Sequence, residues 1–127
     1  MFARITSIIT VLIGLILVNG PLKAEEKTEF VALDGIAYIV PTGSEIGEMR
    51  ERCDTGAVPE VRQACRKKVG DMGVAWDYAV TYKKMGALAD YIHDNAERDD
   101  DWNKMEVYAR KALALQKEIN NEYHLDW

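Results

Sequence analysis

Residues 74–97 read VAWDYAVTYKKMGALADYIHDNAE, and this stretch decides the fold class. Its apolar side chains recur at alternating steps of three and four, at Ala75, Tyr78, Tyr82, Met85, Ala89, Ile92 and Ala96. This spacing places them on one face of an α-helix. The other side carries the charged residues Asp77, Lys83, Lys84, Asp90 and Asp94. The stretch therefore predicts a long helix that packs through one face and exposes the other to water.

Further helical patterns precede and follow this stretch. Pro59 suits the first turn of a helix, and an apolar stripe lies along that helix at Val58, Val61, Cys65, Val69 and Met72. Gly70 and Gly73 predict a break before the long helix. Residues 98–101, an arginine followed by three aspartates, predict a turn and the start of a last helix, because a helix N-terminus favours negative charge. This last helix has apolar residues at Met105, Tyr108, Ala112, Leu115 and Ile119, and we expect it to pair with the long helix in antiparallel fashion.

The segment before these helices predicts a hairpin and a short helix. Two apolar runs, residues 30–33 and 36–40, flank an Asp-Gly pair that tolerates the positive φ of a type I′ turn. An extended arm that ends at Pro41 is the alternative. Thr42 and Glu45 have the spacing of a capping box that would start a short helix, and Ser44 is the alternative cap. The predicted fold is mainly α: a small bundle of about four helices with an N-terminal β-hairpin or extended arm.

The N-terminus has the pattern of a secretory signal peptide. Arg4 precedes an apolar run over residues 5–18, and Ala24 lies just before an acidic pair. An uncleaved anchor is the alternative, but about 14 helical residues span about 21 Å, less than a ~30 Å hydrocarbon core. The sequence predicts a periplasmic or secreted protein without a stable membrane span after cleavage. Its predicted regions are a signal peptide (1–24), a hairpin or arm (25–41) and a helical domain (42–127).

The chain has two cysteines, Cys53 and Cys65. An even number of cysteines in an exported protein favours a disulfide. Both lie on predicted apolar stripes of neighbouring helices, so we expect the bond to staple these helices together. Closing a loop of about 13 residues is worth about 3 kcal/mol in the chain-entropy model.

The charge distribution limits the classes of partner. The formal net charge is −5 at pH 7, and such an acidic surface repels phosphate backbones, which argues against a nucleic-acid partner. One basic cluster is present, formed by Arg62, Arg66, Lys67 and Lys68. It suits either compensation of a helix dipole or a docking patch for an acidic partner or anionic headgroups.

Two short patterns resemble catalytic or calcium sites. Residues 54–56 spell the D-T-G triplet of aspartic proteases, but a helix precedes them here, and helix termination at a glycine explains the triplet. Asp99, Asp101 and Asn103 match the first ligands of a calcium loop. Lys104 and Arg110, however, stand where that loop needs Gly and Glu. A helix N-terminus is the simpler interpretation.

The histidines and cysteines do not have the spacing of a metal centre. His93 and His124 are the only histidines and lie far apart in the chain. A zinc site would also need both thiols reduced, which export argues against. No nucleophile–base pattern or phosphate-binding glycine loop is found in the sequence. We therefore expect no catalytic residues, no metal and no cofactor.

These observations favour a non-catalytic protein–protein interaction module with an unknown partner in the envelope or outside the cell. The candidate binding residues are Trp102, Leu125 and Trp127 as apolar anchors and the basic cluster as a charged patch. Residues 123–127 either fold back on the bundle or present Leu125 and Trp127 to a partner.

Two alternatives come from other classes. One is an enzyme or a small-ligand carrier whose pocket lies between the hairpin and the helices, lined by Tyr38, Tyr78 and Tyr82. The other is a structural subunit of an envelope assembly, which self-association would reveal.

Overall fold

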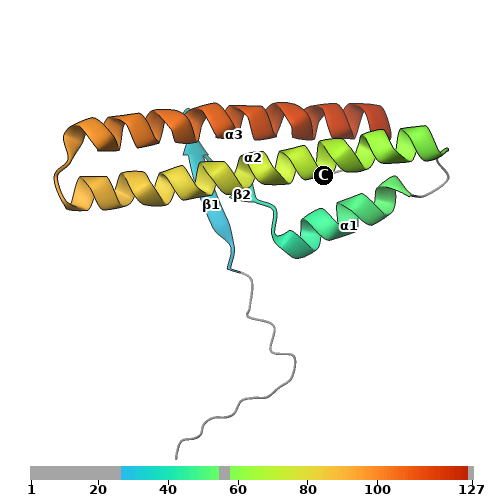
Figure 1. Cartoon of the computed structure of the whole chain (residues 1–127), viewed down its shortest axis with the longest axis horizontal. Helices are drawn as coiled ribbons and strands as arrows, with labels where there is room; N and C mark the ends of the chain where they lie inside the picture. The colour runs from blue at the N-terminus through green and yellow to red at the C-terminus, as the bar shows by residue number, and fades with distance from the viewer. Residues whose placement is uncertain (1–26, 55–57, 126–127) are drawn as a thin grey trace, which may run out of the picture.

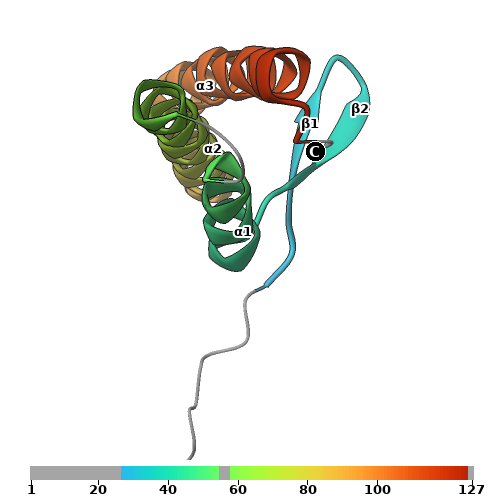
Figure 2. The ribbon, with the colours of Figure 1, turned by 90° about the vertical axis from the view of Figure 1, so that its right-hand side faces the viewer.

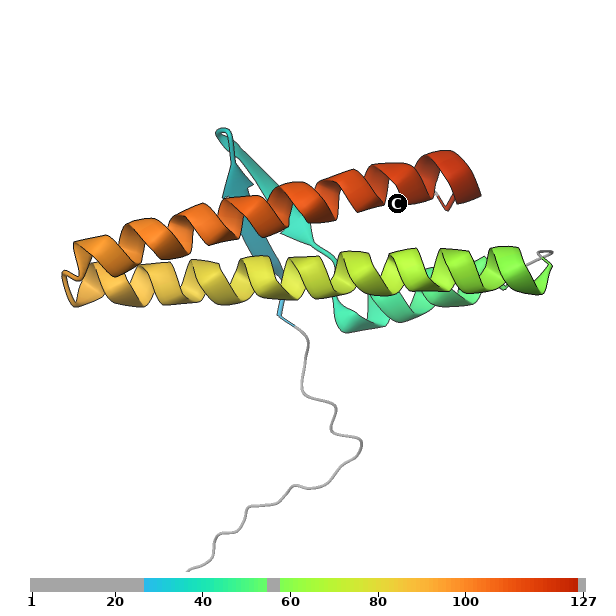
Figure 3. The ribbon, with the colours of Figure 1, turned by 45° about the horizontal axis from the view of Figure 1, so that its top comes forward.

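The computed structural model describes residues 27–54 and 58–125. Over these residues the elements are β1 (Glu29–Leu33), β2 (Ile36–Val40), α1 (Gly43–Cys53), α2 (Pro59–Tyr91) and α3 (Asn95–Tyr123). The two long helices, α2 and α3, lie side by side and run antiparallel, and α1 lies along the first half of α2 (Figure 1; Figure 3). The hairpin closes the remaining side, so the core lies between all four parts of the fold (Figure 2). The predicted signal peptide and Trp127 lie outside the described residues.

The predicted class, mainly α with a hairpin and a disulfide, is confirmed. The expected count of about four helices is not confirmed, because the described residues form three. The predicted break at Gly70 and Gly73 was wrong, since both glycines lie inside the continuous helix α2. They lie where α1 meets α2: a Cβ on Gly73 would be 3.5 Å from the Ile46 side chain. Packing between these helices outweighs the cost of about 1 kcal/mol that each glycine adds to a helix.

The turn between the long helices lies earlier than predicted. It occupies residues 92–94, and α3 begins at Asn95 rather than after residues 98–101. The Asp94 side chain accepts a hydrogen bond from the backbone N–H of Glu97 at 3.2 Å and so caps α3. Arg98 and the three aspartates that follow it consequently lie within the first turns of α3 rather than in a loop.

The buried face of α2 differs from the predicted stripe by about one residue. Tyr78, Met85 and Ile92 are exposed, whereas Ala75 and Ala89 are buried as predicted. The residues that α2 buries along its main core face are Cys65, Val69, Met72, Trp76, Ala79 and Gly86. Because α2 is one continuous helix, the residues that face the core in its first half determine which residues face the core in its second half. Trp76, which is only 1% exposed, therefore enters the core in place of Tyr78.

The local signals before α1 are confirmed. Asp34 (φ 53°) and Gly35 (φ 81°) form the turn, and Leu33 pairs with Ile36 directly beside it. Thr42 and Glu45 form a capping box, in which the Glu45 N–H donates to the Thr42 hydroxyl and the Thr42 N–H donates to the Glu45 carboxylate.

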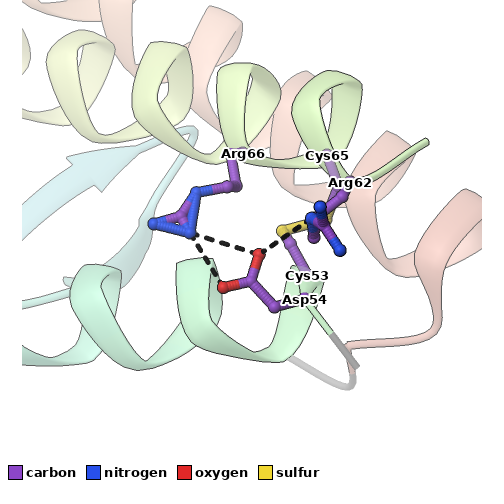
Figure 4. Close-up of a disulfide and its surroundings, with 5 residues drawn as sticks. All are labelled: Cys53, Asp54, Arg62, Cys65 and Arg66. Carbon is purple, nitrogen blue, oxygen red and sulfur yellow. Dashed lines mark hydrogen bonds and ion pairs between the residues drawn. A yellow bond between two sulfur atoms is a disulfide. The ribbon is translucent and has the colours of Figure 1, made fainter. Parts of the chain in front are cut away.

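The disulfide is confirmed and ties the end of α1 to the second turn of α2 (Figure 4). The Cα atoms of Cys53 and Cys65 lie 5.6 Å apart. The C-terminal segment joins the same end of the molecule, because Leu125 is buried and its carbonyl oxygen accepts a hydrogen bond from Arg52 at 2.9 Å. Within the described residues, no helix has both the length and the hydropathy of a transmembrane span.

Candidate functional site

The predicted basic cluster is neutralised by carboxylates of the same chain. Arg66 donates two hydrogen bonds to Asp54 beside the disulfide, at 3.0 and 3.2 Å, and Arg62 is 3.8 Å from the same carboxylate (Figure 4). Lys67 pairs with Asp71 at 2.9 Å, and Lys68 pairs with both Glu122 and Glu118. These four cations therefore do not form an uncompensated docking patch.

The ion pairs of Lys68 change the pKa values of the groups that form them. Hydrogen bonds that Lys68 donates to Glu122 and Glu118 raise the pKa of Lys68 to about 12. The same bond from Lys68 lowers the pKa of the Glu122 carboxyl. These ion pairs link the start of α2 to the end of α3.

The predicted apolar anchors do not form one surface. Trp102 is half-buried on Gly86, with ring atoms 3.0–3.1 Å from the position of a Cβ there. Leu125 is buried at the opposite end of the helical pair, so the chain folds back at this residue rather than presenting it to a partner. Trp127 is outside the described residues.

A cleft of about 560 Å³ lies between the hairpin and the helices, where a ligand pocket was the alternative prediction. The predicted tyrosines do not line it: Tyr78 and Tyr82 stack on Tyr108 of α3, at 4.9 and 5.8 Å between ring centroids. The residues that line the cleft are Lys27, Glu29, Val40, Pro41, Thr42, Gly43, Asp77, Val80 and Thr81. The charged groups of this lining are the ammonium of Lys27 and the carboxylates of Glu29 and Asp77.

No family model, curated protein or solved structure matches the chain. We therefore infer the function of this chain from the chemistry of its own surface.

The most extensive apolar feature outside the core is on the outer face of α2. We call it the outer stripe, and it consists of Val74, Tyr78, Thr81, Met85 and Leu88 of α2 together with Ile92, the C-cap residue that follows the helix. The five large apolar members are between 42% and 61% exposed. Their steps of four and three residues place them on one side of α2, opposite Trp76 and Ala79. Figure 2 shows the hairpin, α1 and α3 on the other sides of this helix. Tyr78 lies at the edge of the stripe and stacks on Tyr108 of α3, and the rest of the stripe faces away from these elements.

Sequence reasoning found only part of the outer stripe. The sequence pattern placed Tyr78, Met85 and Ile92 on the buried face of the helix. It gave Val74 and Leu88 no role. The available signal was a second apolar repeat in the same helix, offset from the one that contains Trp76. Two such repeats in one helix indicate that both sides of it meet apolar surfaces.

A cluster of carboxylates lies on the first turns of α3. Glu97, Asp100 and Asp101 each place one carboxylate oxygen within 4.8 Å of the others. Asp101 is 1% exposed, and its Oδ1 atom has no hydrogen-bond partner. Sequence reasoning considered Asp99, Asp101 and Asn103 as cation ligands, and only Asp101 belongs to this cluster. The cluster depends on where α3 begins, which the sequence had placed several residues later.

Proposed function

We propose that the chain is an exported, non-catalytic protein-interaction module that associates through the outer stripe of α2. The observation that carries this proposal is the exposure of five large apolar side chains in an uncharged stripe. Monomeric proteins rarely leave such a contiguous surface in water unless it serves an interaction. Support for export comes from the leader pattern of residues 1–24 and from the disulfide, a bond typical of oxidising compartments.

The partner that fits this surface is a second copy of the chain. The steps along the stripe are four, three, four, three and four residues, so they read the same in both directions. Two α2 helices that pair antiparallel therefore place every stripe residue opposite another stripe residue. Val74 lies opposite Ile92, Tyr78 opposite Leu88 and Thr81 opposite Met85, which pairs larger with smaller side chains.

The flanks of the stripe are compatible with this pairing. The arrangement brings Asp77 of one copy beside the exposed Tyr91 of the other, where the phenol donates to the carboxylate. Lys84 lies near the twofold axis beside its own symmetry mate. Its charge is compensated within the chain, because its Nζ atom is 3.4 Å from a carboxylate oxygen of Glu29. One helix from each copy makes a small interface, so we expect an affinity in the micromolar range, on the order of 10⁻⁶ M.

The test is the mass of the protein in solution, measured by light scattering over a concentration series. The full mature chain should shift from monomer to dimer with increasing concentration. Leu88→Lys should remain monomeric over that range and keep the melting temperature of the dilute, monomeric parent chain, because Leu88 is 61% exposed. Val107→Lys is the matched control, since Val107 is equally exposed but lies on α3. A chain that stays monomeric at all concentrations, or a control variant that dissociates equally, contradicts the proposal.

The cleft supports a small-ligand carrier as a second candidate. Its volume lies within the range of about 300–1,000 Å³ that ligand pockets occupy. Its lining is less suitable, because three charged side chains, Lys27, Glu29 and Asp77, line it together with only a few apolar groups. Binding of a small molecule that is lost in Asp77→Ala and retained in Leu88→Lys would favour this candidate over self-association.

A further inference from the structure

We propose that Glu97, Asp100 and Asp101 form a binding site for one calcium ion at the start of α3. The three residues have the spacing i, i+3 and i+4, which places their side chains on one side of a helix. One oxygen from each carboxylate lies within 4.8 Å of the other two. Three carboxylates at this separation repel one another unless a cation lies between them.

The burial of Asp101 points to a ligand independently of this clustering. Its side chain is 1% exposed, which makes it the one charged residue in the core of the described chain. Its Oδ1 atom is buried without a hydrogen-bond partner. A buried carboxylate oxygen without a hydrogen-bond partner is unfavourable in a folded protein, and coordination of a metal is one of the few ways to satisfy it.

The geometry favours calcium over smaller cations. Two oxygens bound to one Ca²⁺ at about 2.3–2.6 Å can be up to about 4.6–5.2 Å apart, whereas Mg²⁺ at about 2.0–2.1 Å brings them within about 4.2 Å. The oxygens of the cluster lie within 4.8 Å of one another, and Ca²⁺ can bridge any separation up to this limit. Carboxylate oxygens are hard ligands that suit Ca²⁺ rather than zinc or copper. Glu97 and Asp100 are exposed, so water can complete the coordination.

The charges around the cluster do not replace the cation. Arg98 is turned toward other carboxylates, with contacts to Asp99 at 3.1 Å and Asp90 at 3.4 Å. Lys104 is the one cation paired with the cluster in the described residues, at 3.1 Å from an Asp100 oxygen. It neutralises a single carboxylate and competes with the ion for it.

The experiment measures calcium binding to the full mature chain by calorimetry and by melting temperature. We expect one site with a dissociation constant on the order of 10⁻⁴–10⁻³ M, as in extracellular calcium modules. In 10 mM Ca²⁺ the melting temperature should rise by about 6–12 °C. Trp102 is next to Asp101 in sequence, so Tb³⁺ in the site should show luminescence sensitised by this indole. Excess Ca²⁺ should displace that signal.

Five variants test for a specific site rather than a general attraction of cations to an acidic surface. Asp101→Asn and Glu97→Gln should abolish both binding and the thermal shift. Asp99→Asn, which removes an exposed carboxylate of the same acidic run, should retain both. Lys104→Gln should tighten binding about two- to fivefold, because it removes the competing cation. Leu88→Lys should bind calcium normally, since the site does not depend on the proposed dimer.

The proposal fails if the chain shows no saturable calcium binding. It fails equally if Asp101→Asn binds as well as the parent chain, or if Asp99→Asn loses as much as Glu97→Gln. Should Asp101→Asn not fold, Glu97→Gln and Lys104→Gln decide the question, because both residues are exposed and shift the affinity in opposite directions.

Discussion

Single residues set how closely the two long helices approach each other. Gly86 is buried on α2, and the Trp102 indole of α3 lies where a side chain at position 86 would begin. The glycine therefore provides space for an aromatic ring on the facing helix. Alanines provide the same close approach further along the pair, at Ala79, Ala109 and Ala112.

A larger residue at position 86 should destabilise the fold. Gly86→Leu must displace the Trp102 ring, at an expected cost of about 1–3 kcal/mol in the free energy of unfolding. Gly47→Ala is the control in α1: a Cβ there meets nothing within 4 Å, so the change should stabilise by up to about 1 kcal/mol. Urea denaturation measures both values. Equal effects of the two substitutions would show that the Trp102 contact does not limit the packing.

For single residues, the sequence predicted features that depend on residue type alone. It did not predict features that depend on how the helices pack. The pairing of Cys53 with Cys65 could be predicted because the chain offers no other partner for either thiol. The burial of Asp101 could not, because an aspartate in an acidic run is ordinarily solvated. Its position depends on the start of α3 and on the phase of two long helices, neither of which a single residue type encodes.

At the scale of elements, the hairpin is held on the helices by its turn. Asp34 accepts two hydrogen bonds from Arg110 of α3, both at 3.1 Å. These hydrogen bonds, and the charge of Arg110, lower the pKa of Asp34 below its ordinary value of 3.8. A second contact lies on β1, where the Lys83 ammonium donates to the carbonyl oxygen of Phe30. The hairpin thus depends on α2 and α3 for its place in the fold.

This ion pair gives the hairpin a dependence on acid. Because the pKa of Asp34 is lower in the folded state, its stabilisation is present above about pH 3.8, the unfolded value, and is lost as the pH falls through the folded pKa. Asp34→Asn keeps a residue that tolerates the positive φ but removes the charge. We expect the variant to be slightly less stable than the parent at pH 7 and equally stable near pH 2, as measured by urea denaturation at each pH. A difference that stays constant from pH 7 to pH 2 would exclude the ion pair as its cause.

Among the elements, those specified by neighbouring residues were predicted correctly. The Asp34–Gly35 turn and the Thr42 capping box are complete within four residues, so the sequence contains all their determinants. The break at Gly70 and the turn at residues 98–101 were wrong for a common reason. Glycines and acidic runs weaken a helix locally, but contacts with α1 and a cap at Asp94 decide where the helices continue and end.

At the scale of the whole molecule, the outer stripe is the consequence of a fold with few layers. The hairpin, α1 and α3 cover one side of α2, and the described chain has no further element for the other side (Figure 2). The stripe and the core face were merged in the sequence prediction because both repeat in steps of three and four. Only the packing of the whole molecule separates the face that is covered from the one that is free.

The disulfide and the proposed export can be tested together on the intact protein. The form isolated from the envelope or the medium should have lost residues 1–24, and reduction should add the mass of two hydrogens. Reduction should also lower the free energy of unfolding by about 2–4 kcal/mol. A Cys53→Ser/Cys65→Ser chain is the control, because its stability should not respond to reductant. Recovery of the full-length, reduced protein from the cytosol would contradict the assignment.

The short sequence distance between the two sulfurs has a consequence for the order of folding. The disulfide joins residues separated by 12 positions, whereas the contact between Asp34 and Arg110 joins residues separated by 76. Short loops close much faster than long ones. We therefore expect the disulfide to form while the chain is still largely unstructured. The helices α2 and α3 should then pair, starting from the turn at residues 92–94. The hairpin, whose partners lie furthest away along the chain, docks last.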